Sequence, residues 1–225
     1  MKTFSTFLAV FAVALGLMAQ ESMAESPNTK AKVAVKVSRV ESMDSPTMAT
    51  GTAEKPFKPK KWAYIEAELK VQALPVPKTG YLDNLTVKFY VVSKSPEGPK
   101  GMLLMNKEIK YVNIPVDQPI YVCAFMSPSS IRRLTGGETV SAGLFKRIGV
   151  EVTYKGAIVG SDSNSGKPGW WNSTSKTIIP TTSYPLLNKN ETPFSIFWYD
   201  RYPEIASPKD DDASSSSESS SSVDA

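Results

Sequence analysis

The chain of 225 residues contains no histidine and a single cysteine, Cys123. The lack of histidine excludes Ser-His-Asp and Cys-His catalysis and removes the commonest zinc ligand. One cysteine cannot form an internal disulfide. Cys123 lies in the apolar run 120–126, where we expect it to be a buried small hydrophobe; the alternatives are a disulfide to another chain or a reactive thiol. We therefore predict no catalytic residues, no metal ligands and no cofactor.

Other arrangements that carry chemistry are also weak or missing. No glycine-rich phosphate loop occurs. Glu66 and Glu68 share one face of a predicted strand, but Lys70 beside them is typical of a solvated sheet face. Residues 162–166 copy the first half of a calcium loop, yet the glycine comes one residue early and no closing glutamate follows. Ser173 and Lys176 have the spacing of a Ser-Lys pair but lack its helix. The sequence predicts a protein that is not an enzyme.

Long hydrophobic runs are absent except near the N-terminus, at residues 7–19, and that run is too short for a spanning helix. It follows Lys2 and precedes small residues at Ser22 and Ala24 that suit a signal peptidase. We predict a signal peptide over residues 1–24, with cleavage after Ala19 as the second choice. The mature chain is then exported, to the periplasm, the outer-membrane surface or the medium, and has no membrane span.

The C-terminal residues 209–225 are nearly all serine and acidic residues, with one lysine and five carboxylates for a net charge of −4. Such a segment cannot bury enough apolar surface to order itself, so we predict a disordered acidic tail. Residues 25–208 form the remaining single domain, whose positive charge is dispersed. Because no cluster of basic residues appears, we predict no binding to nucleic acid.

The rest of the chain is organised around residues 62–74, where apolar and polar side chains alternate from Trp62 to Leu74 without a slip. A period of two over this length is typical of a long strand with one buried and one solvated face. We expect it to be the central strand of an antiparallel sheet, with residues 30–40 as an edge strand beside it. Pro75 and Pro77 end the central strand.

Further strands are predicted over residues 81–93, 102–112, 120–126 and 177–179. The clearest hairpin turns at Lys155-Gly156. Ser127, Pro128 and Gly136 are typical of the start and end of one short helix. About seven short strands with frequent turns, in a chain with 17 prolines, are typical of an all-β protein. We predict an antiparallel β-sandwich, immunoglobulin-like in the broad sense, and leave the strand order open.

Aromatic residues supply the candidate binding site. Trp170 and Trp171 lie in a loop rich in glycine and proline, and Tyr184 follows nearby. Exposed planar rings on a β-sandwich provide a platform for sugar rings and also serve as protein-binding hot spots. The alternative is that the tryptophans pack over the open end of the core. The aromatic residues of 194–202 are expected to be core, and Asp200 is expected to pair with Arg201.

The run 187–203, LNKNETPFSIFWYDRYP, resembles a family of small secreted proteins from mucin-dwelling gut bacteria. One branch of that family, encoded beside type IV pilus-like machinery, is immunoglobulin-like. The resemblance implies an exported, non-enzymatic protein tied to the cell surface or to pili. It supplies no functional residues.

Two hypotheses follow. The first is a structural or interaction protein of the cell envelope, with envelope or pilus proteins as partners and a role in adhesion. The second is a carbohydrate-binding module for host mucin glycans, using Trp170, Trp171 and Tyr184. The oligomeric state stays open.

Overall fold

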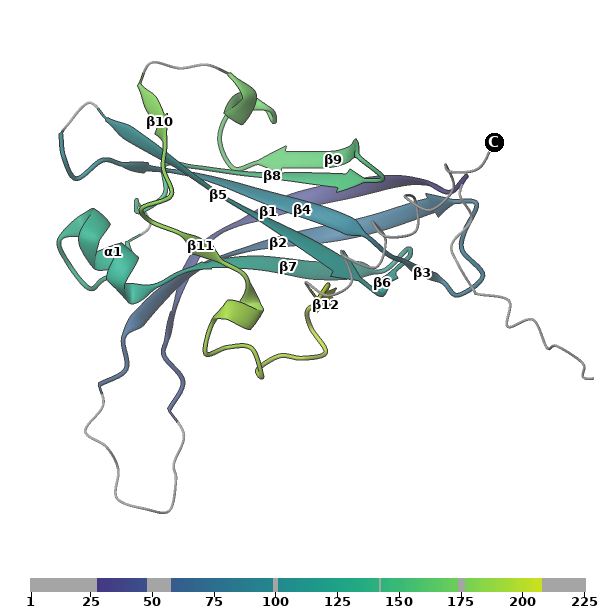
Figure 1. Cartoon of the computed structure of the whole chain (residues 1–225), viewed down its shortest axis with the longest axis horizontal. Coiled ribbons are helices and arrows are strands. Elements are labelled where there is room, and N and C mark those ends of the chain that lie inside the picture. Colours follow the sequence, from purple (N-terminus) through teal and green to yellow (C-terminus); the bar gives the residue numbers. More distant parts are fainter. Residues whose placement is uncertain (1–27, 48–57, 99–100, 142, 174–176, 208–225) are drawn as a thin grey trace, which may run out of the picture.

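The computed structural model describes residues 28–47, 58–98, 101–141, 143–173 and 177–207. The predicted signal peptide and acidic tail lie outside these residues. Two β-sheets pack face to face, as Figure 1 shows. The predicted all-β sandwich is confirmed. No helix of the described ranges has the length and hydrophobicity that a bilayer crossing demands.

The first sheet has the order β1-β2-β7-β11, in which β11 is the short strand Leu186–Leu187. The predicted central strand is β2 (Lys61–Leu74), which lies between β1 (Lys30–Asp44) and β7 (Pro119–Met126), antiparallel to both. Alternation in β2 has the predicted effect, because every second side chain faces the other sheet and is at most 8% exposed. These inward residues are Ala63, Ile65, Ala67, Leu69, Val71 and Ala73.

The second sheet has the order β10-β5-β4-β8-β9, with β12 beside β5. Its strands are β4 (Leu85–Lys94), β5 (Met102–Val112), β8 (Arg147–Tyr154), β9 (Ala157–Ser163), β10 (Ile178–Pro180) and β12 (Glu204–Ile205). The predicted hairpin is β8–β9, with Lys155 and Gly156 at φ of 50° and 76° in its turn. One pair departs from the expected antiparallel pattern, because β10 runs parallel to β5. A separate two-stranded ribbon joins β3 (Tyr81–Leu82) to β6 (Ile114–Pro115).

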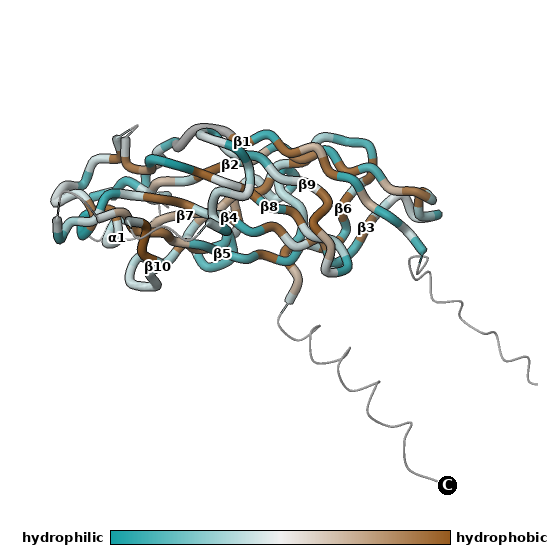
Figure 2. Tube along the Cα trace, turned by 90° about the horizontal axis from the view of Figure 1, so that it is seen from above, coloured by the Kyte–Doolittle hydropathy of each residue, from teal (hydrophilic) through white to brown (hydrophobic). Residues whose placement is uncertain are grey.

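The core lies between the two sheets and is built from the inward residues of β2, β4, β7 and β8. Phe89, Ile65 and Ile148 are at most 1% exposed. Figure 2 shows hydrophobic and hydrophilic residues succeeding one another along these strands, as expected where one face of each sheet is buried. Burial of such side chains stabilises each by about 1.5–3 kcal/mol, and the described part of the chain relies on this core without a disulfide.

The predicted helix is α1 (Pro128–Thr135). The side chain of Ser127 accepts a hydrogen bond from the backbone N–H of Ser130, and Pro128 occupies the first turn. Gly136 ends the helix at φ 74°, a conformation that glycine adopts without strain. Ile131 and Leu134 bury the inner face of α1 against the core.

One side of the sandwich is closed by contact between β1 and β9. The backbone N–H of Val37 donates to the Asp162 carboxylate at 2.9 Å. Gly160 allows the close approach, because a Cβ there would lie 2.3 Å from the carbonyl oxygen of Val33. On the opposite side, β7 and β5 border the gap between the sheets. Short strands from the C-terminal part of the chain, β11 (Leu186–Leu187) and β12, pair with them.

The expectation that the outer face of β2 is solvated is wrong for half of its length. Trp62 is 8% exposed, and it forms a second, smaller hydrophobic cluster with Cys123, Phe125 and Phe194 on that face. This cluster is the anchor of the C-terminal segment described next.

Candidate functional site

The candidate site is built by residues 188–205, here called the C-terminal segment, which cross the open side of the sandwich from β11 to β12. Figure 1 shows this yellow-green part of the chain passing beside β7 and returning to β5. It includes most of the run 187–203 that carried the family resemblance. The segment thus bridges the two sheets.

The segment starts with a well-capped turn. The 3₁₀ helix η2 (Lys189–Glu191) has a capping box, in which the Asn188 side chain accepts from the N–H of Glu191 at 3.1 Å and the Glu191 carboxylate accepts from the N–H of Asn188 at 2.7 Å. The hydroxyl of Thr192 then donates to the carbonyl of Lys189 at 2.7 Å. These local bonds make the geometry of the turn well defined.

Phe194 anchors the middle of the segment and is 2% exposed. Its ring stacks on Phe125 with centroids 5.3 Å apart and meets Trp62 edge-on at 5.6 Å. Aromatic pairs in these geometries contribute about 0.5–1.5 kcal/mol each beyond the area they bury. The expectation that Phe194 is core is therefore correct.

Arg201 holds the far end of the segment through Glu66 on β2. Its guanidinium donates two hydrogen bonds to the Glu66 carboxylate, at 2.7 and 3.1 Å, and Tyr202 donates a third at 2.7 Å. The guanidinium also lies 3.9 Å from the centre of the Tyr121 ring. These bonds to Glu66 raise the pKa of Arg201, while burial is the main cause of the raised pKa of Tyr202. Arg201 therefore pairs with Glu66, which lies 135 positions away in the sequence, and not with the expected partner Asp200.

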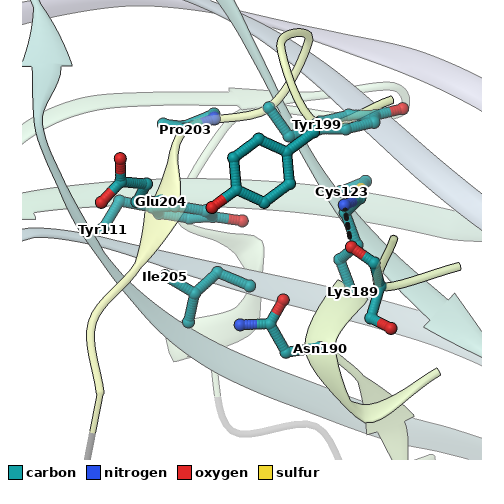
Figure 3. Close-up of a pocket in the computed structure, with 10 residues that line it drawn as sticks. Tyr111, Cys123, Lys189, Asn190, Tyr199, Pro203, Glu204 and Ile205 are labelled. Atoms are coloured by element: carbon teal, nitrogen blue, oxygen red, sulfur yellow. Dashed lines mark hydrogen bonds between the residues drawn. The ribbon is translucent and has the colours of Figure 1, made fainter. Parts of the chain in front are cut away.

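Beneath the segment lies a cavity of about 170 Å³. Figure 3 shows Lys189 and Glu204 on opposite sides of it. The other residues that line it come from β5, β7 and the segment itself: Tyr111, Cys123, Asn190, Ser195, Tyr199, Tyr202, Pro203 and Ile205.

Lys189 is the unusual residue of this cavity because only 6% of it is exposed. Its ammonium donates to the carbonyl of Ser195 at 2.6 Å, drawn as a dashed line in Figure 3, and lies 5.8 Å from the centre of the Tyr199 ring. Desolvation lowers the pKa of Lys189. Nothing in the local sequence of Lys189 signals burial, so this residue could not be predicted from the sequence.

Cys123 faces the same cavity and is 2% exposed. Burial, followed by the nearby Glu66 carboxylate, raises the pKa of its thiol to about 12. A thiol with a raised pKa stays protonated and is a poor nucleophile at neutral pH. The structure agrees with the expected buried small hydrophobe.

Above the cavity the segment presents three exposed apolar residues, named here the apolar loop: Ile196, Trp198 and Tyr199, which are 66%, 46% and 71% exposed. The expectation that Trp198 and Tyr199 are core is wrong. Trp198 also has a positive φ of 51°, a conformation that is strained for a bulky residue. Such strain persists only where the surroundings hold it, and it concentrates at functional sites.

The predicted ligand residues Trp170 and Trp171 lie together in η1 (Trp170–Asn172) on the outer face of the second sheet. Trp171 stacks on Tyr90 of β4 at 4.7 Å, donates to Glu151 at 3.1 Å and is 7% exposed. Trp170 is half-buried, donates to Ser163 at 2.9 Å and meets Trp171 edge-on. The two indoles therefore do not share one plane.

Tyr184, the third predicted ligand residue, packs into the main core and is 7% exposed. The Arg133 guanidinium of α1 lies 4.7 Å from the centre of its ring. Tyr184 thus belongs to a different packing environment from η1. Carbohydrate binding by the three residues stays a prediction, in which Trp170 offers the accessible ring.

The side chains of Asp162 and Asn164, which suggested half of a calcium loop, accept hydrogen bonds from backbone N–H groups. Asp162 accepts from the N–H of Val37 at 2.9 Å, and Asn164 accepts from the N–H of Ile148 at 2.7 Å. The described part of the chain contains no cluster of three metal-ligating side chains.

Comparison with known proteins decides the family. A protein-family model matches residues 24–209, and a crystal structure of a protein from Akkermansia muciniphila superposes with a TM-score of 0.77 at 44% sequence identity. The match covers 81% of this chain and 96% of that one. The chain belongs to the same family. No curated protein matches.

Akkermansia muciniphila is a mucin-degrading gut bacterium, so the resemblance drawn from residues 187–203 is confirmed. Because the match covers both sheets of the sandwich, the relative supports the fold as a whole.

Proposed function

We propose that this protein is an exported, non-enzymatic structural or interaction protein of the bacterial envelope, which binds a protein partner of pili or of an adhesive assembly through the apolar loop. Family membership supports the structural role. The pilus and adhesion roles rest on the family resemblance of residues 187–203. The observation that carries the binding proposal is that Ile196, Trp198 and Tyr199 are exposed on a segment that is fixed at both ends.

Rigid exposed aromatic residues are well suited to protein binding. They bury a large area at low cost in conformational entropy, and interface hot spots are enriched in Trp and Tyr. Phe194 fixes the loop on one side and the Glu66–Arg201 pair fixes it on the other. Isolated apolar side chains are normal on a protein surface. Three large exposed ones within four positions of the chain form a cluster, which is less common and marks interaction sites.

Several titratable groups among the described residues are held in their neutral form at pH 7. Burial raises the pKa values of Tyr90 and Cys123 to about 12 and shifts that of Tyr111 upward, so that these groups stay neutral at pH 7. A general base or nucleophile needs a pKa near the working pH. With no histidine in the sequence, the proposal does not include an enzymatic reaction.

The test is cross-linking and mass spectrometry in the source bacterium, with the wild-type chain and an Ile196→Ser/Tyr199→Ser variant. The matched control is Ile158→Ser, since Ile158 is 61% exposed on β9. We expect cross-links to pilus or other envelope proteins to disappear in the first variant and to persist in the control. Equal cross-linking in all three chains contradicts binding through the apolar loop, and turnover of a substrate by the purified chain contradicts the non-enzymatic role.

A second candidate function is carbohydrate binding at η1. A surface hollow of about 330 Å³ is lined by Trp170, Trp171, Leu104 and Ile178, among others. Sugar rings stack on accessible indole faces. A glycan array that shows binding by the wild-type chain and its loss in Trp170→Ala supports this function, whereas an array without signal contradicts it.

A further inference from the structure

Lys189 is only 6% exposed, and its ammonium lacks a full set of hydrogen-bond partners among the described residues. A lysine ammonium has three N–H donors. Among the described residues, one of the three has an acceptor, the Ser195 carbonyl at 2.6 Å. No carboxylate in the described part of the chain forms an ion pair with Lys189, because the nearby Glu191 pairs with Lys107 at 2.7 Å instead.

Burial of an uncompensated charge is costly, and proteins place such charges beside partners or ligands. Here the ammonium borders the cavity of about 170 Å³ under the C-terminal segment. This is room for several water molecules or for one small organic acid. The cavity, which opens to solvent, therefore places an under-coordinated cation beside a volume that a small carboxylate could fill.

We propose that this cavity binds a carboxylate group, whose oxygens accept hydrogen bonds from Lys189 and from the side-chain amide of Asn190. The source is either a free small organic acid or the C-terminal carboxylate of a peptide. The proposal does not rest on partner binding by the apolar loop, although Tyr199 belongs to both the loop and the cavity lining.

The rest of the lining determines which carboxylates fit. Tyr111, Tyr202 and Ile205 provide apolar walls for a short carbon chain. Glu204 lies across the cavity from Lys189, as Figure 3 shows, and its carboxylate accepts from the Asn113 side chain at 3.0 Å. A second negative charge on the ligand would lie near Glu204. Monocarboxylates are thus preferred over dicarboxylates.

The experiment is an NMR titration of the full, ¹⁵N-labelled chain at constant ionic strength. The probes are propionate, propionamide, succinate, the dipeptide Gly-Gly and Gly-Gly amide, with sodium chloride as the blank. We expect saturable shifts of the Asn190, Ser195 and Ile205 signals with propionate or Gly-Gly, weaker binding of succinate and no response to either amide. Binding of Gly-Gly alone identifies a peptide C-terminus as the source, and binding of propionate identifies a free acid.

Variants separate this site from unspecific charge attraction. Lys189→Met is expected to weaken binding by about 10- to 100-fold, since hydrogen bonds to charged groups carry this much affinity. Lys36→Met removes an exposed lysine on β1 and is expected to change nothing. Ile205→Trp fills the cavity and keeps Lys189. It provides a second test of binding if Lys189→Met does not fold. The proposal is overturned if no carboxylate gives saturable shifts, if the amides bind equally well, or if Ile205→Trp leaves the affinity unchanged.

Discussion

The guanidinium of Arg201 donates two hydrogen bonds to the carboxylate of Glu66, at 2.7 and 3.1 Å, and so ties the end of the C-terminal segment to the outer face of β2. The Glu66 side chain is 17% exposed and that of Arg201 is 44% exposed. This bidentate pair, together with Tyr202, fixes the end of the C-terminal segment to the first sheet.

Glu66→Gln is expected to lower the free energy of unfolding by about 1–2 kcal/mol, because a bidentate pair is strong but Arg201 is partly solvated. Limited proteolysis should then cleave within residues 196–203 before the rest of the domain. Glu68→Gln is the control on the same strand face. Equal destabilisation by the two substitutions would show that the pair with Arg201 has no special role.

Gly149→Ala should displace Trp171 from the outer face of the second sheet. A Cβ at Gly149 would lie 2.2 Å from Cζ3 of the Trp171 ring. Overpacking of this kind costs about 1–3 kcal/mol, and tryptophan fluorescence should shift to the red. Gly98→Ala is the control, since nothing lies within 4 Å of a Cβ there. An unchanged spectrum and stability in Gly149→Ala would contradict the described packing.

Tyr154→Phe should leave the stability unchanged or raise it by about 1 kcal/mol, because the buried Tyr154 hydroxyl has no hydrogen-bond partner among the residues that the structure describes. Tyr202→Phe should act in the opposite direction, since its hydroxyl donates to Glu66 at 2.7 Å. Denaturant titration of both variants provides the measurement. A loss of stability in Tyr154→Phe would show that its hydroxyl has a partner in solution.

The stability of the protein should fall as pH rises from about 9 to about 12. The thiol of Cys123 has its pKa raised from 9.0 to about 12 by burial, and that of Tyr90 rises from 10.0 to about 12. Above its ordinary pKa each group ionises in the unfolded chain before it ionises in the folded chain. This ionisation lowers the free energy of the unfolded state relative to that of the folded state. The stabilising contribution is complete below pH 9 and is lost through this window.

Cys123→Ala should flatten the stability profile between pH 9 and 12, as measured by denaturant midpoints at each pH. In the native wild-type chain the thiol should resist alkylation at pH 8 and react once the chain is unfolded. Rapid alkylation of the folded protein would contradict the raised pKa.

Much of the fold could be predicted from local patterns. The alternation in residues 62–74, the capping residues of α1 and the turn at Lys155-Gly156 act within a few positions of the chain, and the structure has all three. The candidate site could not be predicted in this way. Lys189 lies in a polar run, so no periodicity marks it as buried, and the solvated face expected for Glu66 is covered by residues from the other end of the chain.

The amino-acid sequence by itself determined the all-β class, the central strand, the short helix and the tight hairpin, because side-chain periodicity, caps and positive-φ turns are local properties of the backbone. Tertiary structure decided which polar residues lie in the interior. Glu66 and Arg201 meet across 135 positions, Gly149 makes room for Trp171, and Lys189 is enclosed only when the C-terminal segment crosses between the sheets. Contacts of this kind depend on how distant segments pack together.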